Sequence, residues 1–222
     1  MQSRLEGRLS AIRTRTEGSQ VLMSSPQAVQ QHRFVVLGMS GAGKSSLARA
    51  LAATVRAPHI ELDALFWGPA WTPRPDATFR ELTTAAVAAP AWIVDGNYSS
   101  VRDIVWPRAS VAVWLNFPVW LVLWRVFWRT VRRLLRREVL WHGNRESFRR
   151  TFLSRESIFW WVITMHGKRQ REFSLLRDSH QFPNLNWVEI RWPWETKAFV
   201  EAVARDQAKM GLLHSQSDDS PA

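Results

Sequence analysis

The sequence of 222 residues contains no cysteine, which excludes disulfide bonds, thiol nucleophiles and thiolate metal sites. A chain without cysteine suits a reducing compartment, and we expect a cytoplasmic protein. The six histidines lack the spacing of metal ligands, so none of them is assigned to a metal.

The sequence also lacks a hydrophobic run long enough to cross a membrane. The longest candidate, residues 111–126, is interrupted by Asn116, Pro118 and Arg125. We interpret this stretch as a strand, a turn and the start of a helix. A chain of this length suits one domain with a sizeable core, and no membrane span is predicted.

Acidic residues are few, since 19 Asp and Glu stand against 30 Lys and Arg, for a formal net charge of +11. The excess is uneven, because residues 125–156 hold ten arginines and only three acids. Several of the fourteen tryptophans lie before or among these arginines: Trp120, Trp124, Trp128 and Trp141. Such a positive field attracts polyanions, which include nucleotide phosphates, nucleic acids and anionic membranes.

A glycine-rich stretch at residues 33–46, RFVVLGMSGAGKSS, matches the phosphate-loop pattern G-x-x-x-x-G-K-[ST]. It has the order of a short apolar strand, a glycine turn and the start of a helix. Glycines let successive backbone N–H groups point at phosphate oxygens, and the helix N-terminus adds its positive dipole. The residues expected to cradle the phosphates are Gly38, Ser40, Gly41, Ala42, Gly43, Lys44, Ser45 and Ser46.

Two side chains of this phosphate loop have specific expected roles. Lys44 would bring a positive charge to the β- and γ-phosphates, and the Ser45 hydroxyl would ligate Mg²⁺. Leu47, Leu51 and Val55 follow four residues apart, which predicts a helix directly after the loop. The alternative is an ordinary glycine turn, but the match and its context favour binding of a nucleoside triphosphate, ATP.

Residues 1–31 lack convincing periodicity and are rich in polar residues, so we expect a disordered extension. A transit peptide is a second interpretation, although Glu6 and Glu17 count against it. Met23 is an alternative start of translation.

We expect one α/β domain of the P-loop NTPase class over residues 32–206, with a five-stranded parallel sheet flanked by helices. Within it, residues 64–90 are expected to form a flap over the acceptor side, and residues 137–154 a lid. Residues 207–222 are expected to be a flexible tail. The predicted strands cover residues 34–37, 59–62, 91–94, 110–115 and 187–191.

The helices predicted after the first one cover residues 78–89, 119–137, 155–176 and 195–204. Thr78 and Glu81 match a capping box at the start of helix 78–89. The core face of helix 119–137 is predicted from apolar residues three or four apart: Trp120, Leu123, Phe127, Val131 and Leu134. The arginines of this helix lie on its other faces, and their simplest interpretation is a solvated basic surface.

Two carboxylates follow predicted strands, and ligands of parallel α/β sheets bind at the carboxyl ends of the strands. Asp63 is therefore where a carboxylate on the substrate side is expected, and it would be the general base for a hydroxyl acceptor. Its equally weighted alternative is a helix N-cap. Asp95 is expected to hold Mg²⁺ through water, together with Ser45, and the alternative is a turn aspartate before Gly96.

From about residue 33 to 204, the chain resembles the small P-loop kinases, which include adenylate, shikimate and gluconate kinases. Pro118 followed by Arg125 and Arg129 resembles the spacing in adenylate kinases. The resemblance implies that Arg125 stacks on the adenine and that Arg129 reaches the transferring phosphate. It also implies that Arg155 leads the helix after the lid.

The segments 62–67 (LDALFW), 94–98 (VDGNY) and 140–147 (LWHGNRES) look like a bacterial subgroup labelled adenylate-kinase-like ATPases or DNA topology modulation proteins. Adenylate kinases hold the acceptor phosphate with two arginines, and the matching positions here are Phe66 and Ser99. Three other arginines could substitute for them: Arg80, Arg102 and Arg108.

The sequence therefore predicts a phosphotransferase that uses ATP and Mg²⁺ and acts on a small-molecule acceptor. The expected catalytic residues are Lys44, Asp63, Arg125, Arg129 and Arg155. Asp63 also resembles the aspartate that contacts the acceptor in shikimate and gluconate kinases. An alternative is a regulatory P-loop ATPase associated with nucleic acid, supported by the arginines with interleaved tryptophans. A third interpretation lays the helix from Trp120 onward on a membrane, and it ranks last because the sheet needs this helix for core packing.

Overall fold

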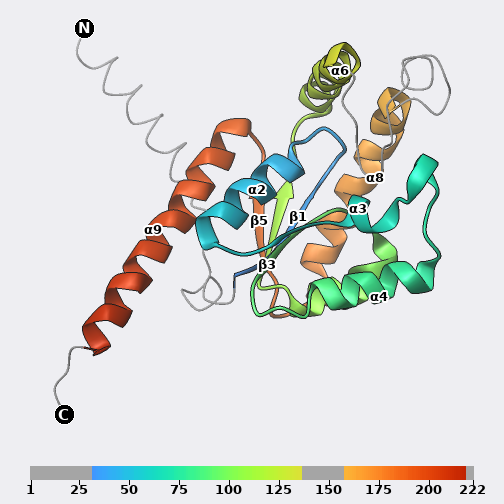
Figure 1. Ribbon diagram of the computed structural model, residues 1–222. Helices are drawn as coiled ribbons and strands as arrows, with labels where there is room; N and C mark the ends of the chain where they lie inside the picture. The colour runs from blue at the N-terminus through green and yellow to red at the C-terminus, as the bar shows by residue number, and fades with distance from the viewer. Residues whose placement is uncertain (1–31, 137–157, 219–222) are drawn as a thin grey trace, which may run out of the picture.

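The computed structural model describes residues 32–136 and 158–218 (Figure 1). The expected N-terminal extension, the expected lid and Arg155 lie outside these residues. Five strands form one sheet: β1 (Arg33–Gly38), β2 (His59–Glu61), β3 (Trp92–Asp95), β4 (Val111–Leu115) and β5 (Asn186–Ile190). Their order is β2-β3-β1-β4-β5 and every pairing is parallel. The predicted α/β fold with a five-stranded parallel sheet is confirmed, and the predicted strand ends differ by one residue at most.

Helices connect the strands, as parallel pairing requires. The helices are α2 (Lys44–Val55), α3 (Leu62–Phe66), α4 (Asp76–Ala86), α5 (Arg102–Val105), α6 (Val119–Arg136), α8 (Ile158–Asp178) and α9 (Pro193–Asp218). Within the described ranges, three short 3₁₀ helices join them: η2 (Pro69–Trp71), η3 (Ser99–Val101) and η4 (Trp106–Arg108). Among the residues that the structure describes, no helix has the length and apolar character to cross a bilayer.

Both faces of the sheet are buried, because successive residues of a strand point to opposite sides. On one side, Phe34 and Val36 of β1 belong to a core with Leu51 of α2 and Phe199 of α9. On the other side, Val35 and Leu37 pack in a second core, which also includes Phe79 of α4 and Phe173 of α8. Figure 1 shows α2 and α9 side by side, with α4 and α8 across the sheet.

Helix α4 differs from its prediction at the N-terminus. It begins at Asp76, and its N-cap is Pro75, with no side-chain capping hydrogen bond. The predicted capping box of Thr78 and Glu81 is therefore wrong. Proline fixes a backbone angle compatible with a helix start, and an aspartate in the first turn complements the helix dipole, so the helix starts two residues earlier.

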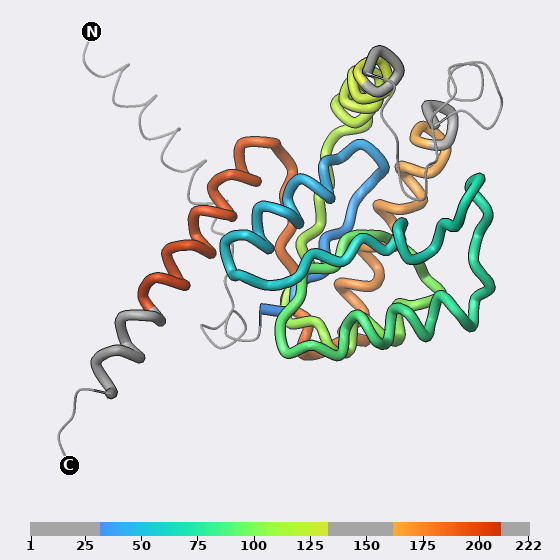
Figure 2. Tube along the Cα trace, in the orientation of Figure 1, coloured from blue at the N-terminus to red at the C-terminus, as the bar shows by residue number. Residues whose placement is uncertain are grey.

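Helix α6 forms where predicted, but its predicted core face is only partly right, because Leu123 packs against the core while Trp120 and Phe127 do not. Val122, Val126 and Thr130 are buried, whereas the side chains of Trp120 and Phe127 are 61% and 39% exposed. The short β-branched side chains allow α6 to approach the phosphate loop closely, which large rings would prevent. Figure 2 shows the coloured part of α6, in yellow-green, projecting away from the rest of the described residues.

Helix α9 is longer than predicted. It was expected to end at Ala204, with a flexible tail over residues 207–222, but it continues to Asp218. Phe199 and Val203 anchor the helix in the core, and the residues that follow include good helix formers. Residues 64–90 contain the end of α3, then η2 and α4, and their role as an acceptor flap stays a proposal.

Candidate functional site

The phosphate loop lies between β1, which ends at Gly38, and α2, which begins at Lys44. Gly41 and Gly43 have φ values of +82° and +97°, in the left-handed region that favours glycine. A Cβ on Gly41 would also lie 2.3 Å from Cγ2 of Val126, so α6 passes directly against the loop. Gly43 is the N-cap of α2 and forms no side-chain cap, which leaves the first amides of the helix suited to an anion.

Lys44 is surrounded by charged side chains from four elements. Its Nζ donates a hydrogen bond to the Met39 carbonyl at 3.2 Å. Burial lowers the pKa of Lys44, nearby Asp63 and Asp95 oppose this shift, and Arg129 and Arg169 add to it. A bound phosphate would supply the negative charge that favours the ammonium form. The structure therefore brings four of the predicted site residues together: Lys44, Asp63, Asp95 and Arg129.

Asp63 lies in the first turn of α3, whose N-cap is Glu61, so the N-cap interpretation of Asp63 is wrong. The hydroxyl of Tyr98 donates a hydrogen bond to Asp63 Oδ1 at 2.6 Å. Burial first, and then the Asp63 charge, raise the pKa of Tyr98, which keeps the hydroxyl protonated as a donor. Phe66 and Phe79 pack on the Tyr98 ring, with centroid distances of 4.8 and 5.2 Å. Asp63 thus has one oxygen fixed by a rigid donor.

Asp95 is the last residue of β3 and is buried, so it is a strand residue rather than a turn aspartate. His59 Nε2 donates to Asp95 Oδ2 at 3.0 Å. Among the described residues, no group of three or more His, Cys, Asp or Glu side chains is arranged to hold a metal. A carboxylate such as that of Asp95 suits Mg²⁺, which is usually bound by one or two protein groups together with phosphates and water. Ser45 lies in the first turn of α2, and its role as a magnesium ligand stays a proposal.

Two arginines of α6 face the loop, so this part of the helix is not the solvated basic surface first expected. Arg125 Nη1 donates to the Ala42 carbonyl at 2.8 Å. Its guanidinium lies over the Phe117 ring, 5.1 Å from the ring centroid, and burial lowers its pKa. Arg129 is half-buried one turn further along and contributes to the potential at Lys44. Arg125 therefore contacts the phosphate loop, and the charge of Arg129 lowers the pKa of Lys44.

Sequence reasoning missed the residue that fixes the start of the loop. Asn97 Oδ1 accepts a hydrogen bond from the Gly38 N–H at 3.2 Å, and Asn97 Nδ2 donates to the Gly38 carbonyl. An amide side chain just after a strand that ends in a carboxylate was the available signal. Asn97 links the end of β3 to the end of β1.

A second missed feature is an ion-paired cluster between α5 and α8. Glu172 accepts from Arg169 Nη1 at 2.7 Å and also from Arg102. Burial alone would raise the pKa of Glu172, but the two arginines outweigh it and the pKa is lowered. Arg169 also acts on the potential at Lys44, so this cluster borders the site. No motif in the sequence distinguishes Arg169 from the other arginines.

The three arginines considered as substitutes for the phosphate-binding pair of adenylate kinases all bind other groups. Arg80 forms hydrogen bonds to both carboxylate oxygens of Asp103, at 3.0 and 2.6 Å. Arg102 pairs with Glu172, and Arg108 donates to the Ile104 carbonyl at 2.6 Å. Carboxylates therefore already compensate the charges of Arg80 and Arg102, and the guanidinium of Arg108 is bound to a backbone carbonyl.

A small hollow, with room for about one water molecule, lies beside Tyr98. The residues lining it are Val35, Leu62, Gly96, Asn97, Tyr98, Val101, Arg102, Val105, Trp106 and Phe173. The wall is mostly apolar, and its polar groups come from the residues that hold Asp63, Gly38 and Glu172. This hollow lies beside the residue that fixes Asp63, but Asp63 is not among the residues that line it.

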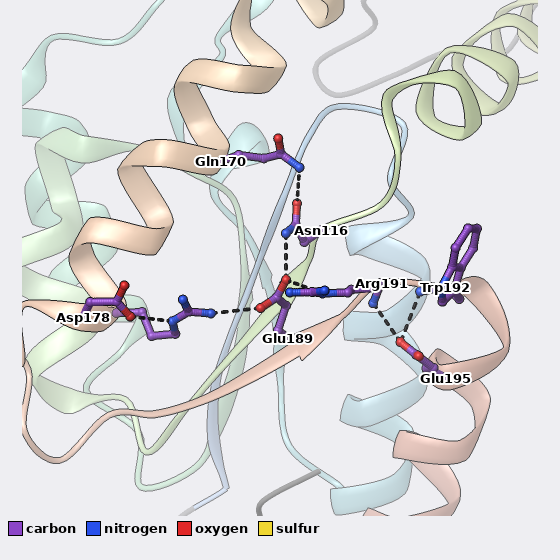
Figure 3. A network of polar contacts seen from close by, with 8 residues as sticks. Asn116, Gln170, Asp178, Glu189, Arg191, Trp192 and Glu195 are labelled. Atoms are coloured by element: carbon purple, nitrogen blue, oxygen red, sulfur yellow. Dashed lines mark hydrogen bonds and ion pairs between the residues drawn. The ribbon is translucent and has the colours of Figure 1, made fainter. Parts of the chain in front are cut away.

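A polar network supports the elements that carry the arginines (Figure 3). Asn116, just after β4, accepts from Gln170 of α8 and donates to Glu189 of β5, both at 2.7 Å. Arg177 and Arg191 also donate to Glu189, at 2.9 and 2.8 Å. Asn116 precedes α6, so its hydrogen bond from Gln170 fixes α8 next to the start of α6. Gln170 is the residue after Arg169, so the same contact also helps to position Arg169.

The sequence matches no protein-family model, and no curated protein matches it. Solved structures with a similar arrangement include a gluconokinase from Sinorhizobium meliloti 1021, at a TM-score of 0.43 and 20% identity, covering 84% of this chain and 98% of that chain. Another is a shikimate kinase from Bacteroides thetaiotaomicron, at a TM-score of 0.42 and 16% identity, covering 78% of this chain and 96% of that chain. At this level of similarity, the substrate of neither enzyme bears on the function of this chain.

Proposed function

We propose that this protein is a phosphotransferase that moves the γ-phosphoryl group of ATP to a hydroxyl group of a small molecule. The observation that carries the proposal is the environment of Lys44. This lysine begins a helix after a glycine loop, and its Nζ donates to the Met39 carbonyl at 3.2 Å. Burial lowers its pKa, the charges of Asp63 and Asp95 oppose this shift, and those of Arg129 and Arg169 add to it. Positive groups at a phosphate loop, with carboxylates facing them, suit phosphoryl transfer, where the main task is to stabilise charge.

The nucleotide side of the proposed site uses the loop and α6. The amides at the start of α2 and the Lys44 ammonium would bind the β- and γ-phosphates, while Arg125 and Arg129 would approach them from α6. Ser45 and, through water, Asp95 would hold Mg²⁺. When bound, Mg²⁺ supplies positive charge to the phosphate oxygens. Asn97 keeps the loop in place through its two hydrogen bonds to Gly38.

The acceptor side favours a hydroxyl over a phosphate. Phe66, at a position that carries an arginine in adenylate kinases, packs in an aromatic cluster with Tyr98 and Phe79. The neighbouring guanidinium groups of Arg80 and Arg102 are engaged with carboxylates. A charged acceptor phosphate would need arginines that are not already paired. A hydroxyl acceptor is therefore favoured over AMP, and AMP serves as a test acceptor.

Asp63 is the proposed general base. It would take the proton of the acceptor hydroxyl while that oxygen forms a bond to the γ-phosphorus and the bond from this phosphorus to the β,γ-bridging oxygen breaks. ADP then leaves. The Tyr98 hydroxyl, bound to Asp63 Oδ1, would orient the carboxylate so that its other oxygen faces the acceptor.

The first test is ADP release from Mg·ATP, measured with AMP and with a panel of polyols and sugar acids. Lys44→Ala should lower turnover by about 10²- to 10³-fold, as expected for loss of one preorganised positive group. Lys197→Ala is the matched control, because Lys197 is exposed on α9 and pairs only loosely with Glu201, at 3.8 Å. Unchanged turnover in Lys44→Ala would overturn the proposal.

The second test separates the base from the nucleotide site. Asp63→Asn should lower acceptor-dependent turnover by about 10²- to 10⁴-fold, the usual contribution of general base catalysis, and leave the Kd for ATP nearly unchanged. Tyr98→Phe should lower kcat less than Asp63→Asn. If AMP stimulates turnover strongly and Asp63→Asn has no effect, the acceptor is a phosphate and not a hydroxyl.

A further inference from the structure

Helix α6 carries two separate apolar faces. Val122 and Val126 are buried in the core, so the helix does cover the sheet. The opposite side exposes four large aromatic side chains at 39% to 61%: Trp120, Trp124, Phe127 and Trp128. The same helix can therefore pack on the sheet and present a second face to another molecule. The need for core packing no longer argues against a surface role.

The exposed side chains form one continuous patch, called here the aromatic face and made of Trp120, Trp124, Phe127 and Trp128. The three tryptophans are four residues apart, so they lie on one side of the helix. The ring centroids of Trp124 and Trp128 are 5.5 Å apart, and those of Phe127 and Trp128 are also 5.5 Å apart. A contiguous exposed patch of large rings is unusual in a soluble monomer and marks an interaction surface.

Charge limits what can cover the aromatic face. The sequence of α6, VWLVLWRVFWRTVRRLLR, holds five arginines and no acidic residue, and the whole chain has a net charge of +11. Arg132, one turn after Trp128, is exposed. An anionic partner complements this surface, whereas a second copy of α6 would bring like charges together.

The ring geometry argues against stacked nucleic-acid bases. The planes of Trp124 and Trp128 meet at 74°, and those of Phe127 and Trp128 at 80°. Successive bases stack on ring faces that are open, but these neighbouring rings stand edge to face. Lipid head groups and acyl chains need no parallel ring faces, and tryptophan prefers the interface between water and lipid.

We propose that the aromatic face of α6 docks the protein on an anionic membrane surface. The tryptophan rings enter the head-group region, and Arg132, which is exposed beside them, contacts lipid phosphates. The helix lies on the bilayer without crossing it, as expected for a basic amphipathic helix. The inference goes beyond the proposed phosphoryl transfer and does not depend on it.

The test is co-sedimentation of the full-length protein with vesicles. We expect binding to vesicles of phosphatidylglycerol and phosphatidylcholine in equal parts, and little binding to phosphatidylcholine alone. The double variant Trp124→Ser/Trp128→Ser should lose affinity for the anionic vesicles by about tenfold or more, because it loses apolar area that enters the interface. Trp194→Ser is the matched control, because Trp194 is 65% exposed but belongs to α9, and it should bind like the wild type.

Two readouts keep the test independent of folding and of turnover. The thermal unfolding midpoints and the basal ADP release of both variants should equal those of the wild type. Absence of wild-type binding to anionic vesicles would overturn the proposal, as would unchanged binding by the double variant. Loss of single-stranded DNA binding in the double variant, with no vesicle binding by the wild type, would assign the face to nucleic acid. Loss of self-association under the same condition would assign it to a second copy of the chain.

Discussion

Helices α2 and α6 both meet the phosphate loop, but they do so in different ways. Helix α2 begins at Lys44 and buries Leu47, Leu51 and Val55 in one core. Helix α6 passes over the loop with Val126 and Arg125, and its far side exposes the aromatic face. Thus α2 has one buried face and meets the nucleotide site only through its N-terminus. Helix α6 divides its surface between the core, the nucleotide site and the exterior, so substitutions on its different faces should have separable effects.

The largest expected effect is a loss of stability on α2. Leu51 is fully buried, and Leu51→Ala should lower the free energy of unfolding by about 2–5 kcal/mol, because it leaves a cavity between α2 and the sheet. Urea denaturation followed by circular dichroism measures the change. Leu175→Ala is the matched control at a side chain that is 71% exposed, and it should stay within about 0.5 kcal/mol of the wild type. Equal effects of the two substitutions would contradict the assignment of the α2 core face.

A second substitution tests the contact between α6 and the loop. Gly41→Ala places a Cβ against Val126 at a positive φ, and overpacking of this kind should cost about 1–3 kcal/mol. ADP release should fall as well, since the loop must shift. The double variant Gly41→Ala/Val126→Ala should recover part of the activity, because it removes the clashing methyl group.

Gly167→Ala is the control for the glycine substitution. Gly167 lies in α8, and a Cβ there has no atom within 4 Å, so the substitution should stabilise the helix by about 0.5–1 kcal/mol. If Gly41→Ala behaves like Gly167→Ala, α6 does not pack on the loop as described.

A smaller effect is expected from acid, through Glu189 and Glu172, whose ion pairs link α8 to β5 and to α5. Burial alone would raise the pKa of Glu189, but Arg191, Asn116 and Arg177 outweigh it and lower the pKa. The pKa of Glu172 is also lowered. A lowered pKa in the folded state stabilises the protein above the unfolded value of 4.5, and this stability is lost as the pH falls through the folded pKa.

Unfolding midpoints measured between neutral and acidic pH should therefore decline below about pH 4.5, and the decline should be shallower in Glu189→Gln. The variant is expected to be less stable than the wild type at neutral pH, because Arg177 and Arg191 lose their charged partner. An identical acid dependence in both proteins would show that Glu189 does not contribute to the loss of stability in acid.

The smallest expected effect is on the aromatic face. Trp120 is 61% exposed, and Trp120→Ser should change the free energy of unfolding by no more than about 0.5 kcal/mol. The same substitution at Trp92, which is fully buried in β3, should destabilise the protein strongly. A large loss of stability in Trp120→Ser would mean that α6 buries its aromatic face after all.

The same two helices show what the sequence could predict. In α2, apolar residues occupy one side only, so periodicity identified the buried face correctly. In α6, both sides are apolar, and periodicity alone favoured the larger rings. Burial was decided by the close approach of Val126 to Gly41, which depends on the fold and leaves no periodic signal.

The candidate site also contains some residues that the sequence could predict and others that it could not. The phosphate loop and the strand ends were predictable, because glycine, lysine and aspartate occupy positions that parallel α/β topology brings together. Asn97 and Tyr98 follow Asp95 directly, but their partners, Gly38 and Asp63, are distant in sequence. Arg169 could not be identified, since it reaches the site only through the packing of α8.

The most direct test of the central claim is the fate of the γ-phosphoryl group. Phosphorus NMR is recorded on Mg·ATP with the protein and whichever polyol or sugar acid of the panel stimulates ADP release. It should show a new phosphomonoester and ADP in equal amounts, with neither formed by Lys44→Ala. Formation of inorganic phosphate alone would contradict transfer to an acceptor. Formation of ADP from added AMP, with no phosphomonoester, would contradict the hydroxyl acceptor.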